Sequence, residues 1–147
     1  MSAALDAIIE DFSVLDDWED RYRYVIELGK TLDPLPEAAH SDVNKVRGCA
    51  SQVWLESHVD RSAEPPRLSW KGDSDAHIVR GLIALALAFF NGRTPREAAE
   101  ADALSFYREL GLVEHLTPQR SNGVRAMIER IKADARAAMP AASLSQG

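Results

Sequence analysis

Residues 73–92 read DSDAHIVRGLIALALAFFNG and contain the most apolar segment of the chain. It predicts a helix over 76–90 whose apolar side chains surround the axis almost completely. A helix that is apolar on most sides is buried in the centre of a protein. We expect the Asp-Ser-Asp segment 73–75 to cap the N-terminus of this helix, and Asn91-Gly92 to end it. The rest of the chain should therefore pack around one central helix.

The residues before this helix favour a small antiparallel sheet. Apolar and polar positions alternate over 53–56, and 68–70 mark a second strand that follows a turn region at 60–66. The segment 43–46 is a candidate for a short third strand, which would make the first hairpin turn near Gly48. We expect this sheet to be covered well on one face.

Helical periods and capping residues account for most of the remaining chain. Helices are expected at 5–15, at 18–29, after the capping box at 94–97, at 102–110 and from 118 onward, with a loop at 31–41 and a fraying tail at about 140–147. The sequence shows no repeat and no inter-domain linker, so 1–147 is expected to form a single domain. The predicted fold class is α+β, with helices packed on a small antiparallel sheet.

The composition excludes several classes of protein. Seventeen Lys and Arg against 23 Asp and Glu leave a formal net charge of −6, which does not suit a general binder of nucleic acid. The longest apolar run, 81–90, is much shorter than the roughly 20 residues that a membrane span needs. The N-terminus also lacks the basic region of a secretory signal. We expect a cytoplasmic protein that binds neither nucleic acid nor a membrane.

One cysteine and four histidines limit the metal chemistry. A single thiol excludes an internal disulfide, a four-cysteine zinc site and a cluster held by cysteines of this chain alone. The histidines show none of the spacings typical of metal ligands. We therefore expect no metal and no cofactor.

Cys49 is the strongest candidate for chemistry. Gly48 beside it suits a tight turn, and Lys45 and Arg47 place positive charge nearby, which favours the thiolate. A reactive thiol is therefore the preferred interpretation over a small buried hydrophobic residue. His58 follows nine residues later along a predicted strand, about 30 Å away at roughly 3.3 Å per residue, so it can serve as a base only if the chain folds back.

Two local rules are broken at the start of the last helix. Arg120 opposes the helix dipole there, and Gly123 inside the helix costs about 1 kcal/mol relative to alanine. Local rules that are broken together can mark a functional site. The alternative is a close helix crossing at Gly123 and a solvated Arg120, and the sequence leaves both interpretations open.

Four blocks of the sequence resemble the signature of the SufE family of sulfur acceptors. They are NKVRGCASQVW at 44–54, GDSDA at 72–76 followed by IVRGLIA at 78–84, HLTPQRSNG at 115–123, and 18–22 together with 27–29. The blocks stand in family order over about 5–138, which is nearly the whole chain. Four blocks in order make the resemblance specific, whereas a lone Gly-Cys pair would carry no weight.

This resemblance implies a fold similar to that of IscU-type iron–sulfur scaffold proteins, and a sulfur carrier without independent enzymatic activity. Members of the family accept sulfane sulfur from the persulfide of a cysteine desulfurase that depends on pyridoxal phosphate (PLP), and they stimulate that enzyme. They pass the sulfur on to an iron–sulfur scaffold of the SufB type. The expected partners are therefore a SufS- or CsdA-like desulfurase and such a scaffold.

The resemblance also implies roles for particular residues. The family's sulfur acceptor is the cysteine of the Gly-Cys block, here Cys49. Asp75 and Arg120 fall at family positions linked to contact with the desulfurase or to placement of the cysteine loop. Arg47, next to that loop, is assigned to the same group.

Two other functions stay open on the residues alone. One is a thiol-dependent enzyme in which a distant histidine is brought near Cys49, and the other is a binding module with an inert cysteine. A sulfur carrier would have to shield its persulfide, because small thiols strip an exposed sulfane sulfur. Shielding raises the pKa of a thiol and opposes the effect of Lys45 and Arg47, so we expect modest reactivity in the free protein.

Overall fold

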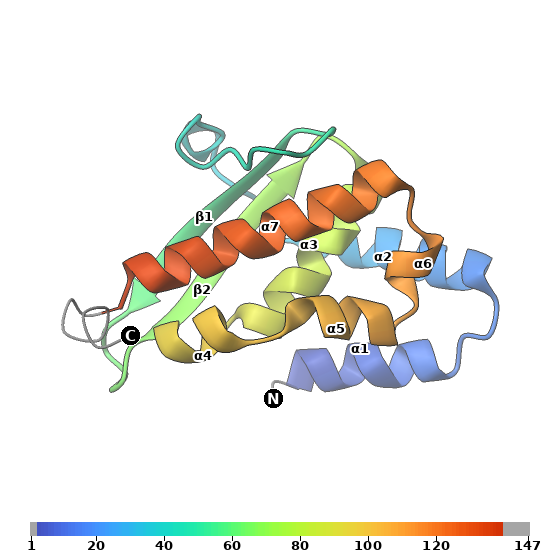
Figure 1. Ribbon diagram of the computed structural model, residues 1–147, viewed down its shortest axis with the longest axis horizontal. Coiled ribbons are helices and arrows are strands. Elements are labelled where there is room, and N and C mark those ends of the chain that lie inside the picture. Colours follow the sequence, from blue (N-terminus) through green and yellow to red (C-terminus); the bar gives the residue numbers. More distant parts are fainter. Residues whose placement is uncertain (1–2, 140–147) are drawn as a thin grey trace.

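The computed structural model describes residues 3–139, in which a two-stranded antiparallel sheet and helices pack around α3 (Figure 1). Along the chain the elements are α1 (Ala3–Ser13), α2 (Trp18–Gly29), the 3₁₀ turn η1 (Glu37–Ala39), β1 (Val53–Asp60), β2 (Arg67–Ser74), α3 (His77–Phe90), α4 (Pro95–Glu100), α5 (Ala103–Glu109), α6 (Leu112–His115) and α7 (Pro118–Ala137). This order confirms the α+β prediction. The tail expected at about 140–147 lies outside the described residues.

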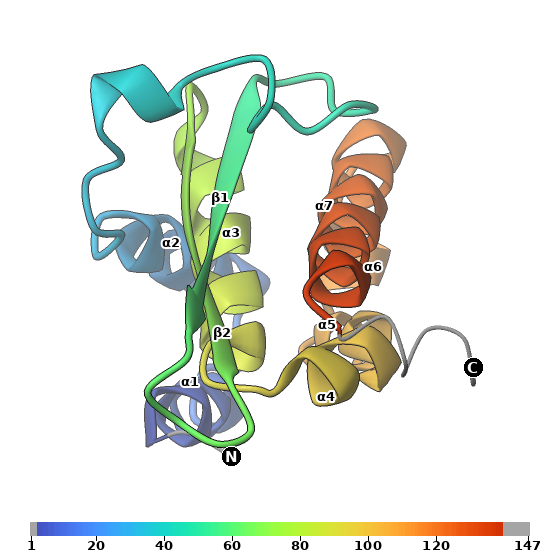
Figure 2. The ribbon, with the colours of Figure 1, turned by 90° about the vertical axis from the view of Figure 1, so that its left-hand side faces the viewer.

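The central position of α3 is confirmed. Ten of its fourteen residues are buried, so the helix contacts other elements on most sides. Figure 1 shows α7 crossing in front of the sheet and α3, and Figure 2 places α2 and α7 on opposite sides of α3. Burying each large apolar side chain contributes about 1.5–3 kcal/mol, so this helix makes a large contribution to core stability.

Helix α2 approaches α3 very closely, and glycine makes that approach possible. A Cβ atom added at Gly81 would collide with the carbonyl oxygen of Val25, and one added at Gly29 would lie 2.7 Å from the backbone nitrogen of Gly81. Neither position can take a larger residue without moving a backbone. The two helices are therefore fixed against each other.

Three of the helix starts follow the sequence. Asp17 accepts a hydrogen bond from the backbone N–H of Glu19 at 3.0 Å and caps α2. Thr94 and the third residue of α4 form the expected capping box, and Thr117 caps α7 with proline following. The sequence did not predict the short helix α6. This helix begins directly after the left-handed turn at Gly111 (φ +75°).

The prediction that 73–75 caps α3 is wrong. Strand β2 extends through Ser74, and Ala76 occupies the N-cap position without a side-chain hydrogen bond. The carboxylate of Asp75 instead accepts a hydrogen bond from the backbone N–H of Gln52 at 3.1 Å. A partner distant in sequence has displaced the local one.

The third strand predicted at 43–46 is also wrong in part. Only an isolated bridge forms there, between Lys45 and Trp54, and the sheet has two strands among residues 3–139. The expected turn is present, because Gly48 adopts a φ of +88° that favours glycine. The chain thus reverses directly before Cys49.

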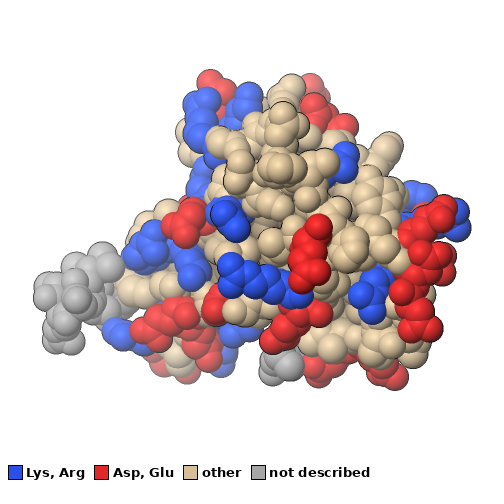
Figure 3. Space-filling view, turned by 45° about the vertical axis from the view of Figure 1, so that its right-hand side comes forward, with Lys and Arg blue, Asp and Glu red and all other residues tan. Residues whose placement is uncertain are grey.

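Two features of the outside of the molecule bear on its possible partners. No helix among residues 3–139 is long and apolar enough to cross a membrane. On the face seen in Figure 3, basic side chains are interspersed with acidic ones, and acidic side chains gather at the right-hand edge. This face offers no continuous basic surface of the kind that nucleic acid requires.

Candidate functional site

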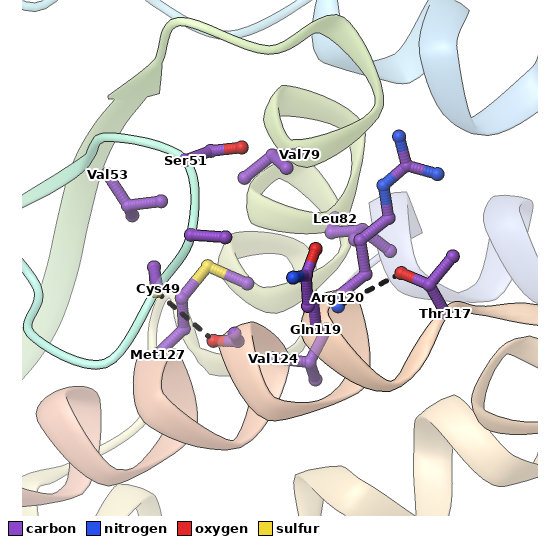
Figure 4. Close-up of a pocket in the computed structure, with 12 residues that line it drawn as sticks. Cys49, Ser51, Val53, Val79, Leu82, Thr117, Gln119, Arg120, Val124 and Met127 are labelled. Atoms are coloured by element: carbon purple, nitrogen blue, oxygen red, sulfur yellow. Dashed lines mark hydrogen bonds between the residues drawn. The ribbon is translucent and has the colours of Figure 1, made fainter.

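The only thiol of the chain lies at a pocket of about 230 Å³ (Figure 4). Cys49 stands on the loop formed by residues 48–51, here called the Cys49 loop, which joins the turn at Gly48 to β1. Helices α3 and α7 supply the apolar floor of the pocket, and the polar residues come from the Cys49 loop and the start of α7. The floor is formed by Val79, Leu82, Val124 and Met127, and the polar side chains are those of Ser51, Thr117, Gln119 and Arg120.

The Cys49 thiol is partly buried and has a hydrogen-bond acceptor. Its Sγ lies 3.6 Å from the carbonyl oxygen of Gly123, to which the S–H donates. Burial raises the pKa of the Cys49 thiol. The positive charge expected from Lys45 and Arg47 does not offset that burial, so the thiolate is disfavoured in the free protein. The partial burial and the direction of the pKa agree with the expectation of a shielded thiol, which alkylation of Cys49 tests.

Arg120 and Gly123, which break local rules at the start of α7, both line this pocket. A Cβ atom added at Gly123 would lie 3.7 Å from the Sγ of Cys49, so this glycine lies against the thiol rather than at a helix crossing. Arg120 lines the pocket, and its Nη1 donates to the hydroxyl of Tyr22 at 3.5 Å. The interpretation of Arg120 as merely solvated is therefore wrong.

The other predicted site residues lie at different distances from the thiol. Asp75 does not line the pocket, but its hydrogen bond to Gln52 holds the residue that follows the Cys49 loop. Arg47 is exposed on the segment before the loop and does not line the pocket either. The structure thus brings Cys49 and Arg120 together, places Asp75 at the loop's end and leaves Arg47 facing solvent.

No histidine among residues 3–139 lines the pocket of Cys49. His58 pairs with Glu56 at 2.9 Å on β1, and His40 pairs with Asp73 at 2.8 Å. The fold therefore does not bring the base that a Cys–His enzyme needs. In the same residues, no group of three His, Cys, Asp or Glu side chains is arranged to hold a metal.

Several pocket residues were missed by sequence reasoning. Val79 and Leu82 have the period of core residues, and nothing local shows that one end of α3 faces a hollow. Thr117 and Gln119 lie in the block 115–123, and that block was the available signal. The contact between Arg120 and Tyr22 spans 98 residues, so no local pattern could show it.

Comparison with known proteins places this arrangement in a family. The model of the SufE family, described as an Fe-S metabolism associated domain, matches residues 6–135. The chain belongs to the SufE family. It is therefore associated with iron–sulfur metabolism, as the resemblance implied.

Two curated relatives support the assignment to SufE. The chain is 56% identical over 138 residues to an uncharacterized SufE-like protein of Rhizobium meliloti (strain 1021), covering 94% of this chain and 99% of that protein. It is 56% identical over 134 residues to an uncharacterized SufE-like protein of Rhizobium etli, covering 91% of this chain and 90% of the relative. The solution structure of a hypothetical protein from Thermus thermophilus has a similar fold, with a TM-score of 0.71 and 26% identity over 92% of this chain and 95% of that one.

Proposed function

We propose that this SufE family member accepts sulfane sulfur on Cys49 from the persulfide of a PLP-dependent cysteine desulfurase, stimulates that enzyme, and passes the sulfur to an iron–sulfur scaffold. The observation that carries the proposal is the placement of Cys49. The only thiol of the chain lies on a loop that begins at a glycine turn and borders a pocket, with no histidine of residues 3–139 beside it. Such a site suits thiol exchange better than hydrolysis.

The transfer needs only one nucleophilic sulfur from this chain. The Cys49 thiolate attacks the outer sulfur of the enzyme persulfide, and a new S–S bond forms as the old one breaks. The desulfurase cysteine leaves as a thiolate, while the outer sulfur keeps its proton and now belongs to Cys49. No electrons are gained or lost overall, so the step requires neither a cofactor nor an oxidant in this chain.

The pocket supports the second half of the proposal, which is carriage of the sulfur. Its volume of about 230 Å³ exceeds several times the roughly 30 Å³ share of one water molecule, so one further sulfur atom fits beside Sγ. Partial burial of Cys49 limits the access of other thiols to that atom. The persulfide is thus sheltered until a partner draws the loop out.

Partner contact is assigned to the outer side of the site. Arg47 is exposed beside the loop, and Arg120 lies at the rim of the pocket. We propose that these residues meet a SufS- or CsdA-like desulfurase, with a SufB-type scaffold as the recipient. Both partners would be met in the cytoplasm.

The test is incubation of the chain with a cysteine desulfurase, cysteine and PLP, followed by intact mass measurement. We expect the mass of one sulfur atom to be added to the wild-type chain and none to Cys49→Ser. Cys49→Ser should also fail to stimulate the desulfurase, while its melting temperature stays close to that of the wild type. An unmodified wild-type chain, or a Cys49→Ser variant that is grossly unstable, would contradict the proposal.

A further inference from the structure

The backbone before the Cys49 loop is held from two sides. Residues 43–47 are here called the arm. On one side, the N–H of Leu55 in β1 donates a hydrogen bond to the carbonyl of Asn44 at 2.8 Å. Residues 42–44 form a turn, and only Lys45 bridges to β1, so the arm is not a continuous strand whose carbonyls a neighbouring strand could satisfy. The carbonyls of Val43 and Lys45 lie on the side of α7. They require a donor from another element.

Arg130 of α7 supplies that donor. Its Nη2 donates to the carbonyl of Val43 at 2.7 Å, and its Nη1 donates to the carbonyl of Lys45 at 3.2 Å. The planar guanidinium presents two donor nitrogens in a fixed geometry to these two carbonyls, whereas a lysine ammonium is a single point of charge on a flexible stem. The Val43 side chain is 81% exposed, so its packing does little to hold this part of the arm.

The guanidinium is itself fixed from behind. Nε of Arg130 donates to the carboxylate of Asp134 at 3.2 Å, and the other oxygen of that carboxylate accepts from Nε1 of Trp70 at 3.1 Å. Trp70 belongs to β2 and is only 2% exposed. The arm is therefore connected through Arg130 and Asp134 to the buried face of the sheet.

The same face of α7 also contacts the thiol. Gly123 lies seven residues before Arg130, which is about two helical turns, so both point to the same side. The contact at Gly123 is a weak S–H hydrogen bond of 3.6 Å, whereas those at Arg130 are charge-assisted. When Cys49 leaves the pocket, the weak contact can break while the arm stays on α7.

We propose that Arg130 is a positioning residue for sulfur transfer. It holds the arm against α7, so that only the Cys49 loop moves. This loop is anchored on its N-terminal side by Arg130 and on its C-terminal side by the hydrogen bond between Gln52 and Asp75. A short moving segment presents Cys49 to the partner persulfide in few orientations. The effect on transfer rests on the proposed function, but the effect on the position of the thiol does not.

The first measurement is the alkylation rate of Cys49 in the free protein. We expect Arg130→Ala to raise this rate about five-fold or more, because a released arm exposes the thiol more often. Arg130→Lys, which keeps the charge but loses the fixed pair of donor nitrogens, should give an intermediate rate. An alkylation rate within about two-fold of the wild type for Arg130→Ala would overturn the proposal, since β1 alone would then hold the arm.

Two controls separate positioning from stability and from charge. Ile131→Val removes one methyl group from a fully buried neighbour on α7, so it lowers stability without touching the arm. Arg136→Ala removes the same charge from an exposed position of the helix. Both variants should leave the alkylation rate unchanged. If either variant raised the rate as much as Arg130→Ala does, the positioning role of Arg130 would be contradicted. If Arg130→Ala does not fold, Arg130→Lys decides, and a wild-type rate there overturns the proposal.

The second measurement is sulfur transfer from the desulfurase. We expect Arg130→Ala to lower the maximal rate about five-fold while the half-saturating concentration changes less than about two-fold, because the loss is in orientation rather than in binding. The reverse pattern would overturn the positioning role. If the wild type accepts no sulfur, the proposed function fails, whereas the alkylation rates still decide whether Arg130 positions the thiol.

Discussion

The proposed function places two opposing requirements on Cys49. Attack on a persulfide needs a thiolate, whereas carriage of the sulfane sulfur needs protection from other thiols. Burial and the S–H bond to Gly123 favour the protonated, protected form in the free protein. If Cys49 accepts sulfur as proposed, movement of the loop on a partner supplies the reactive form, since no histidine lines the pocket among residues 3–139.

The first residue-scale prediction concerns how alkylation of Cys49 depends on pH. Because burial raises the pKa of this thiol, the rate should level off at a higher pH than in an unfolded peptide of residues 46–53. At neutral pH the protein should therefore react more slowly than the peptide. Alkylation rates measured from about pH 6 to 11 check this, and a protein profile at or below the peptide's pH range would show that the thiol is not shielded.

The second residue-scale prediction concerns Asp75 and Arg120. Asp75→Ala loses one exposed hydrogen bond to Gln52, and Arg120→Ala loses a long contact of 3.5 Å to Tyr22. Each should cost at most about 0.5–1.5 kcal/mol of unfolding free energy, yet each should clearly lower desulfurase stimulation. Thermal melts and stimulation assays are compared for both variants. Unchanged stimulation in both would leave these residues with structural roles only.

At the scale of elements, α7 is the part that connects the site. Its first turns present Arg120 and the Gly123 carbonyl to the pocket, and two turns later Arg130 reaches the arm. The arm, the Cys49 loop and β1 are close in sequence, whereas the Gly123 carbonyl that meets the thiol lies 74 residues further along the chain. The geometry of the site is thus set by a helix whose contribution is long-range.

The sequence predicts those elements whose signals are local. The all-round apolar pattern of 76–90 and the capping box at 94–97 were sufficient for α3 and α4. The acidic segment 73–75 has the pattern of a cap, but the carboxylates found partners 23 and 33 residues away, so the local rule failed. The neighbours of Cys49 and the SufE blocks both indicated this candidate, whereas Arg130 could not be predicted because its acceptors are backbone carbonyls that carry no side-chain signal.

The element-scale prediction compares two glycines in helices. Gly81→Ala would place a Cβ atom against the backbone of α2 and should destabilise the protein by about 1–3 kcal/mol or more. Gly123→Ala meets only the Sγ of Cys49 at an ordinary 3.7 Å, so the better helix propensity of alanine should stabilise the protein by about 0.5–1 kcal/mol. Urea denaturation of both variants measures the two changes. A destabilised Gly123→Ala would show that the added methyl group does not fit against the thiol at this distance.

At the scale of the whole molecule, His40 connects the long loop after α2 to the end of the sheet. Its Nδ1 lies 3.1 Å from the carbonyl oxygen of Pro36, and its Nε2 lies 2.8 Å from the carboxylate of Asp73. Both neighbours accept hydrogen bonds, so the ring satisfies them fully only when both nitrogens carry protons. Arg80 approaches the other carboxylate oxygen at 3.4 Å, and the His40 ring packs edge-on against Trp54.

The protonation of this pair gives stability a defined dependence on pH. The hydrogen bond to Asp73 raises the pKa of His40, so its contribution is complete below its unfolded pKa of about 6.5 and is lost as pH rises through the higher folded pKa. Burial tends to raise the pKa of Asp73, but hydrogen bonds from His40 and Ser74 hold it below its usual value. That contribution is lost as pH falls through the lowered pKa. The pair therefore stabilises the fold most between about pH 4 and 6.5.

His40→Gln tests this dependence, because glutamine keeps a polar group but cannot take up a proton. We expect the melting temperature of His40→Gln to lie below that of the wild type at about pH 6, and the difference to shrink as pH rises to about 8.5. His77→Gln, which changes an exposed histidine at the start of α3, is the matched control and should not reproduce this trend. A difference between wild type and His40→Gln that stays constant over this range would show that His40 acts through packing on Trp54. The loop that contains His40 leads directly into the arm. As His40 loses its proton at higher pH, alkylation of Cys49 in the wild type should therefore rise by more than the growing thiolate fraction explains. His40→Gln should not show this additional rise.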